Sequence, residues 1–297
     1  MEILITGSNG FLGSKIKYEL KGHDIKTLSR SNSTYNFDLA SNVPMFDSQF
    51  DLVIHAAGKA HSIPKSDIEK QEFYFINVKG TKNLLDGLSK SGVPKYFVFI
   101  SSVSVYGNEI GYEIDESYTL RALDPYGLSK IEAEQNVVDW CEKNNVICTV
   151  LRLPLVVGTN PPGNLKSMIN AIKHNFYFNI TGGNARKSMV LASDVSKYII
   201  KAAEIGGIFN LTDGCHPNFK ELSNLISLQF GKKFVPNMPL IVAKLLAFIG
   251  DIIGPQFPIN SIKLMKITST LTFNDSNARK AFNWDPTPVL KGFKINE

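Results

Sequence analysis

The chain has 297 residues, of which 43% are hydrophobic and 20% are charged, a composition that excludes a disordered or fibrous protein. Its net charge of +5 comes from 32 basic and 27 acidic residues that are spread along the chain. No basic block with interleaved aromatic residues stands out, so we expect no nucleic-acid partner. A mildly basic surface instead suits an anionic small molecule.

Cysteine usage and the first residues predict a cytoplasmic location. Cys141, Cys148 and Cys215 cannot all pair with one another and lack metal-ligand spacing, which is typical of a reducing compartment and predicts no metal site. Met1 leads directly into a strand pattern, which leaves no room for a signal peptide. The protein is therefore expected to remain in the cytoplasm.

The most apolar stretch, residues 238–249, is interrupted by Lys244 and is shorter than the roughly 18 apolar residues that a membrane-spanning helix needs. It therefore predicts no transmembrane segment. We expect a buried helix there, with some contact to a membrane surface or a partner as the alternative.

Strand-like runs alternate with segments of helical spacing through the first half of the chain. The strand-like runs are residues 2–6, 24–28, 50–55, 96–100 and 146–152, and the helical segments include residues 77–89 and 125–144. This alternation predicts an α/β fold of the Rossmann type, with a doubly wound parallel sheet.

The same pattern predicts two lobes. Residues 1–157 should form the dinucleotide-binding domain, to which one further strand returns at residues 207–212. Residues 158–297 should mainly form a smaller C-terminal substrate lobe. It would lie over the carboxyl ends of the strands, where ligands of such sheets bind.

The stretch GSNGFLG, residues 7–13, follows the first strand and opens a helix. Its three glycines permit a tight turn, close approach of the backbone to a pyrophosphate, and close packing of the helix, whose N-terminus offers free N–H groups. The sequence therefore predicts a dinucleotide site formed by Gly7, Asn9, Gly10, Phe11, Leu12 and Gly13.

The second strand ends in Leu28-Ser29-Arg30, without the carboxylate that would accept hydrogen bonds from the ribose hydroxyls of NAD. Arg30 is instead suited to the 2′-phosphate of NADP(H). We therefore favour NADP(H) as the cofactor, with NAD(H) as the alternative. If Arg30 does not bind a phosphate, it is an ordinary surface arginine.

The stretch DPYGLSK places Tyr126 and Lys130 four residues apart. Asp124 is suited to cap a helix and Pro125 to begin it, so both side chains should lie on one helix face. A lysine ammonium about 4 to 6 Å from the phenol would favour the phenolate by roughly 3 to 4 kcal/mol, about two to three pKa units. We therefore expect Tyr126 to act as a general acid and base.

The glycine spacing, the stretch SSVSVYG and the later YGLSK together resemble the extended short-chain dehydrogenases/reductases, the NAD-dependent epimerase/dehydratase family. The resemblance implies that Ser102, Tyr126 and Lys130 are catalytic, with Ser101 as the alternative hydroxyl. It also implies further cofactor contacts from Asp38, Leu39, Ala56, Ala57, Gly58 and Asn77, together with Tyr126 and Lys130.

Sugar 4,6-dehydratases of this family carry an Asp-Glu pair directly after the catalytic hydroxyl. This chain has Val103-Ser104 at that place, so we do not expect dehydration.

The stretch RLPLVVG, followed by PGN, resembles a bacterial subgroup of UDP-glucose 4-epimerases and UDP-4-keto-6-deoxy-hexosamine reductases from surface-polysaccharide pathways. The resemblance implies a UDP-sugar substrate and a homodimer. The implied substrate contacts are Ser102, Ser104, Asn164 and either Arg186 or Lys187.

These features favour an enzyme that moves hydride at C4 of a UDP-sugar. Arg30 tips the prediction slightly toward a UDP-4-keto-6-deoxy-hexosamine reductase, with a UDP-glucose or UDP-N-acetylhexosamine 4-epimerase as the alternative. A non-catalytic dinucleotide-binding regulator is the alternative of another class, although such proteins are expected to lose the tyrosine or the lysine.

Overall fold

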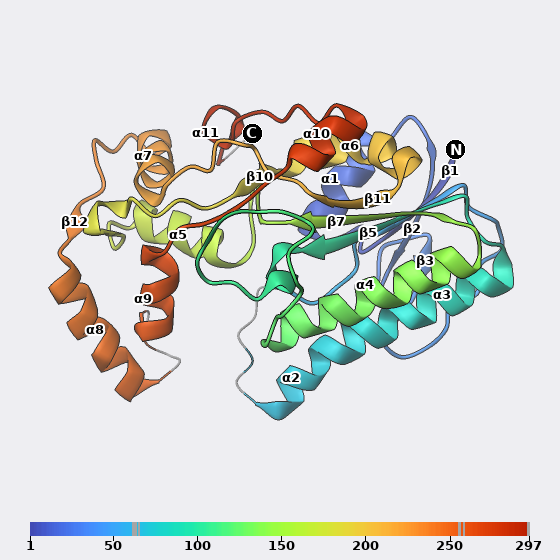
Figure 1. Cartoon of the computed structure of the whole chain (residues 1–297), viewed down its shortest axis with the longest axis horizontal. Coiled ribbons are helices and arrows are strands. Elements are labelled where there is room, and N and C mark those ends of the chain that lie inside the picture. Colours follow the sequence, from blue (N-terminus) through green and yellow to red (C-terminus); the bar gives the residue numbers. More distant parts are fainter. Residues whose placement is uncertain (61–63, 65, 255–256, 258, 296–297) are drawn as a thin grey trace.

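The computed structural model describes residues 1–60, 64, 66–254, 257 and 259–295. Within these residues, a central sheet of seven parallel strands has the order β11-β7-β5-β4-β1-β2-β3 (Figure 1). The strands are β1 (Glu2–Thr6), β2 (Asp24–Ser29), β3 (Tyr35–Asn36), β4 (Leu52–His55), β5 (Tyr96–Ser102), β7 (Ile147–Leu153) and β11 (Gly207–Asn210). The predicted Rossmann-type parallel sheet is confirmed.

Helices cover both faces of this sheet. One face carries α1 (Phe11–Glu19), α6 (Ala192–Ile205) and α10 (Ser276–Phe282), and the other carries α3 (Gly80–Ser91) and α4 (Pro125–Lys143). Successive residues of a strand point to opposite faces, so the apolar run Ile3-Leu4-Ile5 places Ile3 and Ile5 in one core and Leu4 in the other.

Before α3, the chain forms α2 (Asp67–Phe73) and a π-helical turn, η1 (Tyr74–Lys79). The helical segment therefore begins ten residues before the predicted start at residue 77 and reaches Ser91. Its first part lies on the surface beside α4, where apolar periodicity is weak.

The remaining elements form a smaller lobe around three short parallel pairs. The pairs are β8 (Leu155–Val157) with β10 (Met189–Leu191), β9 (Asn179–Ile180) with β12 (Asn237–Met238), and β6 (Gly111–Ile114) with β13 (Leu271–Phe273). The lobe also contains α5 (Gly163–Lys173), α7 (Phe219–Gln229), α11 (Val289–Gly292) and the short turns η2 (Val103–Tyr106) and η3 (Thr181–Gly183). The strand β11 is not the only element that returns to the central sheet from the second half of the chain. The helices α6 and α10 also pack on it.

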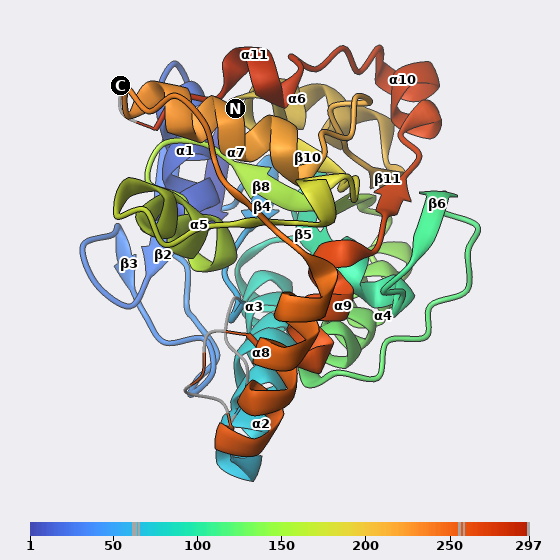
Figure 2. The same ribbon diagram turned by 90° about the vertical axis from the view of Figure 1, so that its left-hand side faces the viewer.

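The prediction that residues 238–249 form a buried helix is wrong. Residues 240–249 do form a helix, α8 (Leu240–Ile253), but it packs against α9 (Ser261–Thr268) in a hairpin at the edge of the molecule (Figures 1 and 2). Its small residues Ala243 and Ala247 are buried, whereas Ile241 and Ile252 are 82% and 71% exposed. Among the described residues, no helix is both long and apolar enough to cross a membrane.

Candidate active site

The glycine loop makes a tight turn between β1 and α1. Gly7 has a φ of 66°, and a Cβ atom there would lie 2.7 Å from the backbone nitrogen of Ala57. A Cβ atom on Gly13 would lie 2.2 Å from the carbonyl oxygen of Gly7, so the first turn of α1 packs directly on the loop. The backbone N–H of Gly10 donates to that same carbonyl at 2.9 Å. Side chains larger than hydrogen at Gly7 and Gly13 are therefore incompatible with this turn.

The other residues predicted for the loop anchor it to its surroundings. Asn9 is exposed, and its amide donates to the backbone carbonyl of Ser31. The ring of Phe11 lies against Gly158, at the start of the smaller lobe, and Leu12 packs against the core under α1.

Arg30 lies directly after β2, next to this loop. Ser29, just before it, contacts the loop through a 3.1 Å hydrogen bond between its hydroxyl and that of Ser8. Ser31, just after it, accepts the hydrogen bond from Asn9. The Arg30 side chain itself is exposed. It is therefore positioned at the rim of the glycine loop, where the adenosine half of a dinucleotide lies in such folds.

The predicted pair Asp38-Leu39 divides into an exposed and a buried residue. The carboxylate of Asp38 accepts hydrogen bonds from the backbone N–H of Ala40 at 3.1 Å and from the hydroxyl of Ser41 at 2.9 Å, so it caps its own turn. Leu39 is buried in the core under α3, and its carbonyl accepts a hydrogen bond from Asn83.

The loop after β4 is held by Asn77. The side-chain amide of Asn77 accepts from the backbone N–H of Lys59 at 2.7 Å and donates to the hydroxyl of Ser129 at 2.9 Å. Through these bonds Asn77 joins the segment Ala56-Ala57-Gly58 to the helix that carries Tyr126. The geometry supports a positioning role for Asn77, whose amide oxygen would lie 3.1 Å from a Cβ atom on Gly58.

His55 ends β4 in a buried position. Its two ring nitrogens form hydrogen bonds with the hydroxyls of Thr6 at 2.6 Å and Thr81 at 2.9 Å. Burial lowers the pKa of His55 to about 3, and the charge of Lys130 adds to this effect, so the ring is neutral at pH 7. These contacts fit a structural role.

Ser102, Tyr126 and Lys130 meet where β5 ends and α4 begins. Asp124 caps α4 by accepting from the backbone N–H groups of Tyr126 and Gly127, as predicted. The hydroxyl of Ser102 lies beside the phenol of Tyr126 and acts to lower its pKa, while the Ser102 proton is donated to Ser104. The ammonium group of Lys130 is buried and donates to the carbonyl oxygen of Ile100 at 2.9 Å.

Burial dominates the protonation of this group of side chains. It raises the pKa of Tyr126, and the hydrogen bond from Ser102 offsets only part of that rise. Burial also lowers the pKa of Lys130 to about 8, against the opposing charge of Glu134. The charge of Asp124 adds to the rise, so the predicted lowering of the Tyr126 pKa by Lys130 is not found.

The structure separates the two serines that the sequence left as alternatives. Ser102 faces Tyr126, whereas Ser101 points to the other side of the strand and donates to the buried carboxylate of Glu134. The same carboxylate is paired with the guanidinium of Arg152, with an N–O distance of 2.7 Å.

A buried polar network extends from this ion pair, which the sequence analysis missed. Arg152 donates to the phenol of Tyr106 at 3.1 Å, and that phenol donates to the side chain of Asn210 at 2.8 Å. Glu134 lies one helical turn after Lys130 on α4, so the two side chains share a helix face. This i, i+4 spacing is the sequence feature that indicates that Glu134 lies near Lys130. The network therefore joins α4, β7 and β11 beneath the catalytic group.

The predicted substrate contacts lie in different surroundings. Ser104 follows Ser102 in the turn η2, and its hydroxyl accepts from that of Ser102 at 3.1 Å. Asn164 is exposed in the first turn of α5.

Arg186 and Lys187 point to opposite sides of their segment. Arg186 donates to the carbonyl of His216 at 3.0 Å and lies 4.0 Å from Glu221, away from η2. Lys187 is partly buried, and burial lowers its pKa to about 8, with the charges of Glu109 and Lys266 acting in opposite directions. Lys187 forms a β-bridge with Leu271, which pairs in turn with Gly111 of β6, so Lys187 lies beside the segment that follows η2.

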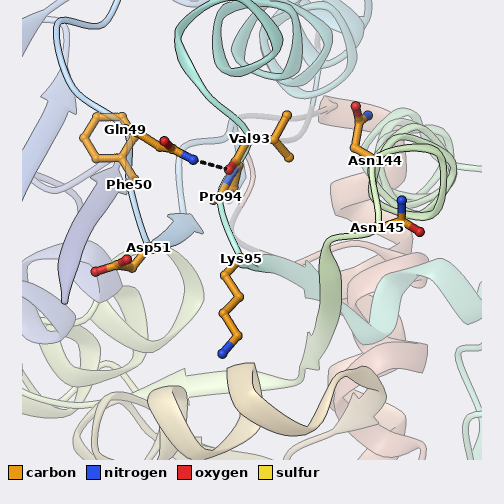
Figure 3. A pocket seen from close by; sticks show the side chains of 8 residues that line it. All are labelled: Gln49, Phe50, Asp51, Val93, Pro94, Lys95, Asn144 and Asn145. Carbon is orange, nitrogen blue, oxygen red and sulfur yellow. Dashed lines mark hydrogen bonds between the residues drawn. The ribbon is translucent and has the colours of Figure 1, made fainter.

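A cavity of about 480 Å³ opens at the opposite end of the sheet (Figure 3). It lies between the segments that lead into β4, β5 and β7, and its lining includes Gln49, Asp51, Lys95 and Asn145. Gln49 donates to the carbonyl of Val93 across one side of the cavity. Since ligands of doubly wound sheets bind at the carboxyl ends of the strands, we do not assign the catalytic site to this cavity.

Comparison with known proteins agrees with this geometry. The NAD dependent epimerase/dehydratase family matches residues 3–211. The chain is 26% identical to N-acetyl-α-D-glucosaminyl-diphospho-ditrans,octacis-undecaprenol 4-epimerase of Escherichia coli O157:H7, over 98% of this chain and 92% of that protein. It is 25% identical to UDP-glucose 4-epimerase of Vibrio cholerae, over 98% and 93% of the two chains.

Solved structures share the fold over the whole chain. The UDP-glucose 4-epimerase of Thermotoga maritima with UDP-glucose superposes with a TM-score of 0.76, at 20% identity, over 100% of this chain and 97% of the other. RMD from Pseudomonas aeruginosa in complex with NADPH superposes with a TM-score of 0.73, at 20% identity, over 98% and 95%. With the family match covering more than half of its length, the chain belongs to the NAD dependent epimerase/dehydratase family, whose members are enzymes of the extended short-chain dehydrogenase type.

Proposed function

We propose that the protein catalyses 4-epimerisation of a diphosphate-linked hexose, with a nicotinamide dinucleotide on the glycine loop. The observation that supports this most directly is the meeting of Ser102, Tyr126 and Lys130 at the carboxyl end of β5. Val103, in the place of the dehydratase acid pair, instead packs against a small apolar cluster, which speaks against dehydration.

The residues present fit a nicotinamide dinucleotide. Helix α1 begins after Gly10 without a side-chain cap and without an acidic residue in its first turn, so its N–H groups are available to a pyrophosphate. Gly58 lies beside the catalytic lysine, since a Cβ atom there would be 3.4 Å from the Lys130 ammonium nitrogen. When bound, the cofactor would accept hydride from C4 of the sugar and return it.

The side chains of this chain would handle the proton and the orientation of the sugar. Ser102 would hold the C4 oxygen by a hydrogen bond, and Tyr126 would take the hydroxyl proton and later give it back. Lys130, which is mostly protonated at pH 7 because its pKa is about 8, would hold a positive charge at the end of β5 through its hydrogen bond to the Ile100 carbonyl. Burial of Tyr126 favours the neutral phenol, which is the form that donates the proton to a keto oxygen.

The substrate lobe would bind the diphosphate. We assign this contact to Lys187 in preference to Arg186, because Lys187 lies near the segment that follows the catalytic turn. Ser104 and Asn164 remain candidate contacts to the sugar and its carrier. The two whole-chain relatives differ in that carrier, which is UDP in one name and undecaprenyl diphosphate in the other.

An NMR assay of sugar products would test the proposal. Purified protein without added cofactor is expected to interconvert the 4-epimers of UDP-glucose, UDP-N-acetylglucosamine or N-acetylglucosaminyl-diphospho-undecaprenol, and Tyr126→Phe should abolish the conversion. Tyr112→Phe is the matched control, because Tyr112 is 73% exposed on β6. No conversion of any of the three, by protein that binds the cofactor, would contradict epimerisation.

A single reduction at C4 is the second candidate, because Arg30 lies at the rim of the glycine loop. Net oxidation of NADPH by a UDP-4-keto-6-deoxy-hexosamine would support it. Loss of a charge-assisted hydrogen bond in Arg30→Ala should weaken NADPH binding about 10- to 100-fold and leave NADH binding unchanged. Lys21→Ala, an exposed residue just after α1, is the control, and tighter binding of NADH than NADPH by the parent protein would refute the role of Arg30.

A further inference from the structure

Helix α8 shows the reverse of the usual burial pattern for an amphipathic helix. Its small residues, Ala243, Ala247 and Gly250, are buried. Its large apolar side chains are exposed, and those exposed by more than half are Ile241, Leu245, Phe248, Ile252 and Ile253. On the neighbouring α9, Ile262 and Met265 are also exposed. Soluble proteins seldom expose such a continuous apolar face unless it binds something.

The small buried residues explain how this face is held outward. A Cβ atom on Gly250 would lie 1.8 Å from the carbonyl oxygen of Ile259, so the segment leading into α9 packs directly on the α8 backbone. Asp251 strengthens this junction by accepting from the backbone N–H of Ser261 at 3.0 Å. The hairpin therefore has a fixed geometry that presents its large side chains to the outside.

Lysines outnumber acidic residues in the hairpin and in the residues that lead into it. Residues 232–268 contain five lysines, Lys232, Lys233, Lys244, Lys263 and Lys266, and one acidic residue, Asp251. Lys244 lies on α8 itself and is exposed, and the single carboxylate is engaged by Ser261. An apolar face with a basic border is complementary to a bilayer surface with anionic headgroups.

The hairpin is connected to the substrate side of the molecule. Helix α9 packs against η3, and Lys266 of α9 pairs with Glu109 at an N–O distance of 2.9 Å. Glu109 follows the catalytic turn η2 and also influences the pKa of Lys187. Figure 1 shows α8 and α9 extending from the left end of the molecule.

We propose that the hairpin of α8 and α9 docks on an anionic lipid bilayer, with the face formed by Ile241, Leu245, Phe248 and Ile252 among the headgroups. With 14 residues, α8 is about 21 Å long, too short to span a hydrocarbon core of about 30 Å, so it would lie in the interface. A second copy of the chain fits less well, because a two-fold contact through this face would bring the lysine borders of both copies together. This inference goes beyond the proposed reaction and does not depend on it.

Vesicle sedimentation with the full-length protein tests the docking. The protein should partition onto phosphatidylcholine vesicles that contain one third phosphatidylglycerol, and more weakly onto phosphatidylcholine alone. Ile241→Gln combined with Ile252→Gln should lower the partition coefficient at least tenfold, since two exposed aliphatic side chains would no longer be buried. Lys244→Gln should lower it about fivefold on the anionic vesicles only.

Leu228→Gln is the matched control, because Leu228 is 66% exposed on α7, outside the hairpin. Circular dichroism and thermal melting would establish that each variant is folded. These two measurements do not depend on catalysis. Equal partitioning of the parent and the Ile241/Ile252 variant would overturn the proposal. Sedimentation velocity without vesicles gives a second test. The proposal would also be overturned if the parent were a dimer and the Ile241/Ile252 variant a monomer, since a second copy of the chain would then cover the face.

Discussion

Replacing the buried Lys130 by methionine is expected to abolish turnover and yet stabilise the fold. A lysine whose pKa falls from 10.5 to about 8 costs the native state about 3 kcal/mol at pH 7, because the unfolded chain holds the proton more tightly. Methionine avoids this cost and gives up the hydrogen bond to the Ile100 carbonyl, worth about 1 kcal/mol. The net gain should be about 2 kcal/mol in the free energy of unfolding.

The pH dependence gives this prediction its sharpest test. Between pH 8 and pH 10.5 the native lysine is mostly neutral while the unfolded lysine is mostly charged, so the parent protein gains stability as the pH rises through this window. The cost of Lys130 should fall from about 3 kcal/mol at pH 7 to about 1 kcal/mol at pH 9.5. Other groups titrate in both proteins, so the difference between parent and variant isolates Lys130.

Urea unfolding of the parent and of Lys130→Met at pH 7 and pH 9.5 measures this difference. Lys143→Met is the matched control, because Lys143 is an exposed lysine in the last turn of the same helix. A parent-to-variant difference that stays constant between the two pH values would refute the reasoning, because the buried lysine would then carry no shifted pKa.

Four further substitutions test the site and its support. Ser102→Ala should lower kcat about 10²- to 10³-fold in the product assay, because the reacting oxygen loses a hydrogen-bond donor. Ser101→Ala should instead lower the urea midpoint and leave kcat largely unchanged, because Ser101 binds the buried Glu134. Glu134→Gln should cost about 3 to 5 kcal/mol in urea unfolding, because the buried guanidinium of Arg152 loses its counter-charge; an unchanged midpoint would contradict this. Gly13→Ala should weaken cofactor binding and lower the melting temperature, both measured by fluorescence, and wild-type values would show that the loop can yield around the added methyl group.

The strands of the central sheet could be predicted because their apolar runs are continuous and local. The first strand has the predicted bounds, Glu2–Thr6, and β5 runs two residues further than predicted. That extension explains the two serines: Ser101 and Ser102 lie in the strand, so their side chains point to opposite faces, one toward Glu134 and the other toward Tyr126. The sequence could name both candidates but not separate them.

Other features depend on contacts between distant residues and could not be predicted. Apolar composition gave no indication that α8 buries its alanines and exposes its isoleucines, because that depends on how α9 packs against Gly250. The direction of the Tyr126 pKa shift depends on how deeply the folded chain buries the phenol. The spacing of Tyr126 and Lys130 alone does not show this burial. The homodimer implied by the family resemblance remains a prediction.

The return of α6, β11 and α10 to the central sheet bears on how this enzyme could be divided or recombined. Val195 and Ile199 of α6 share one core with Ile3 and Ile5 of β1, so a gene fragment ending at residue 157 would leave that core open. Substrate specificity could not be exchanged by swapping a terminal module. It would have to be grafted as two separate inserts, residues 158–191 and 211–275, onto a sheet that keeps its own α6, β11 and α10.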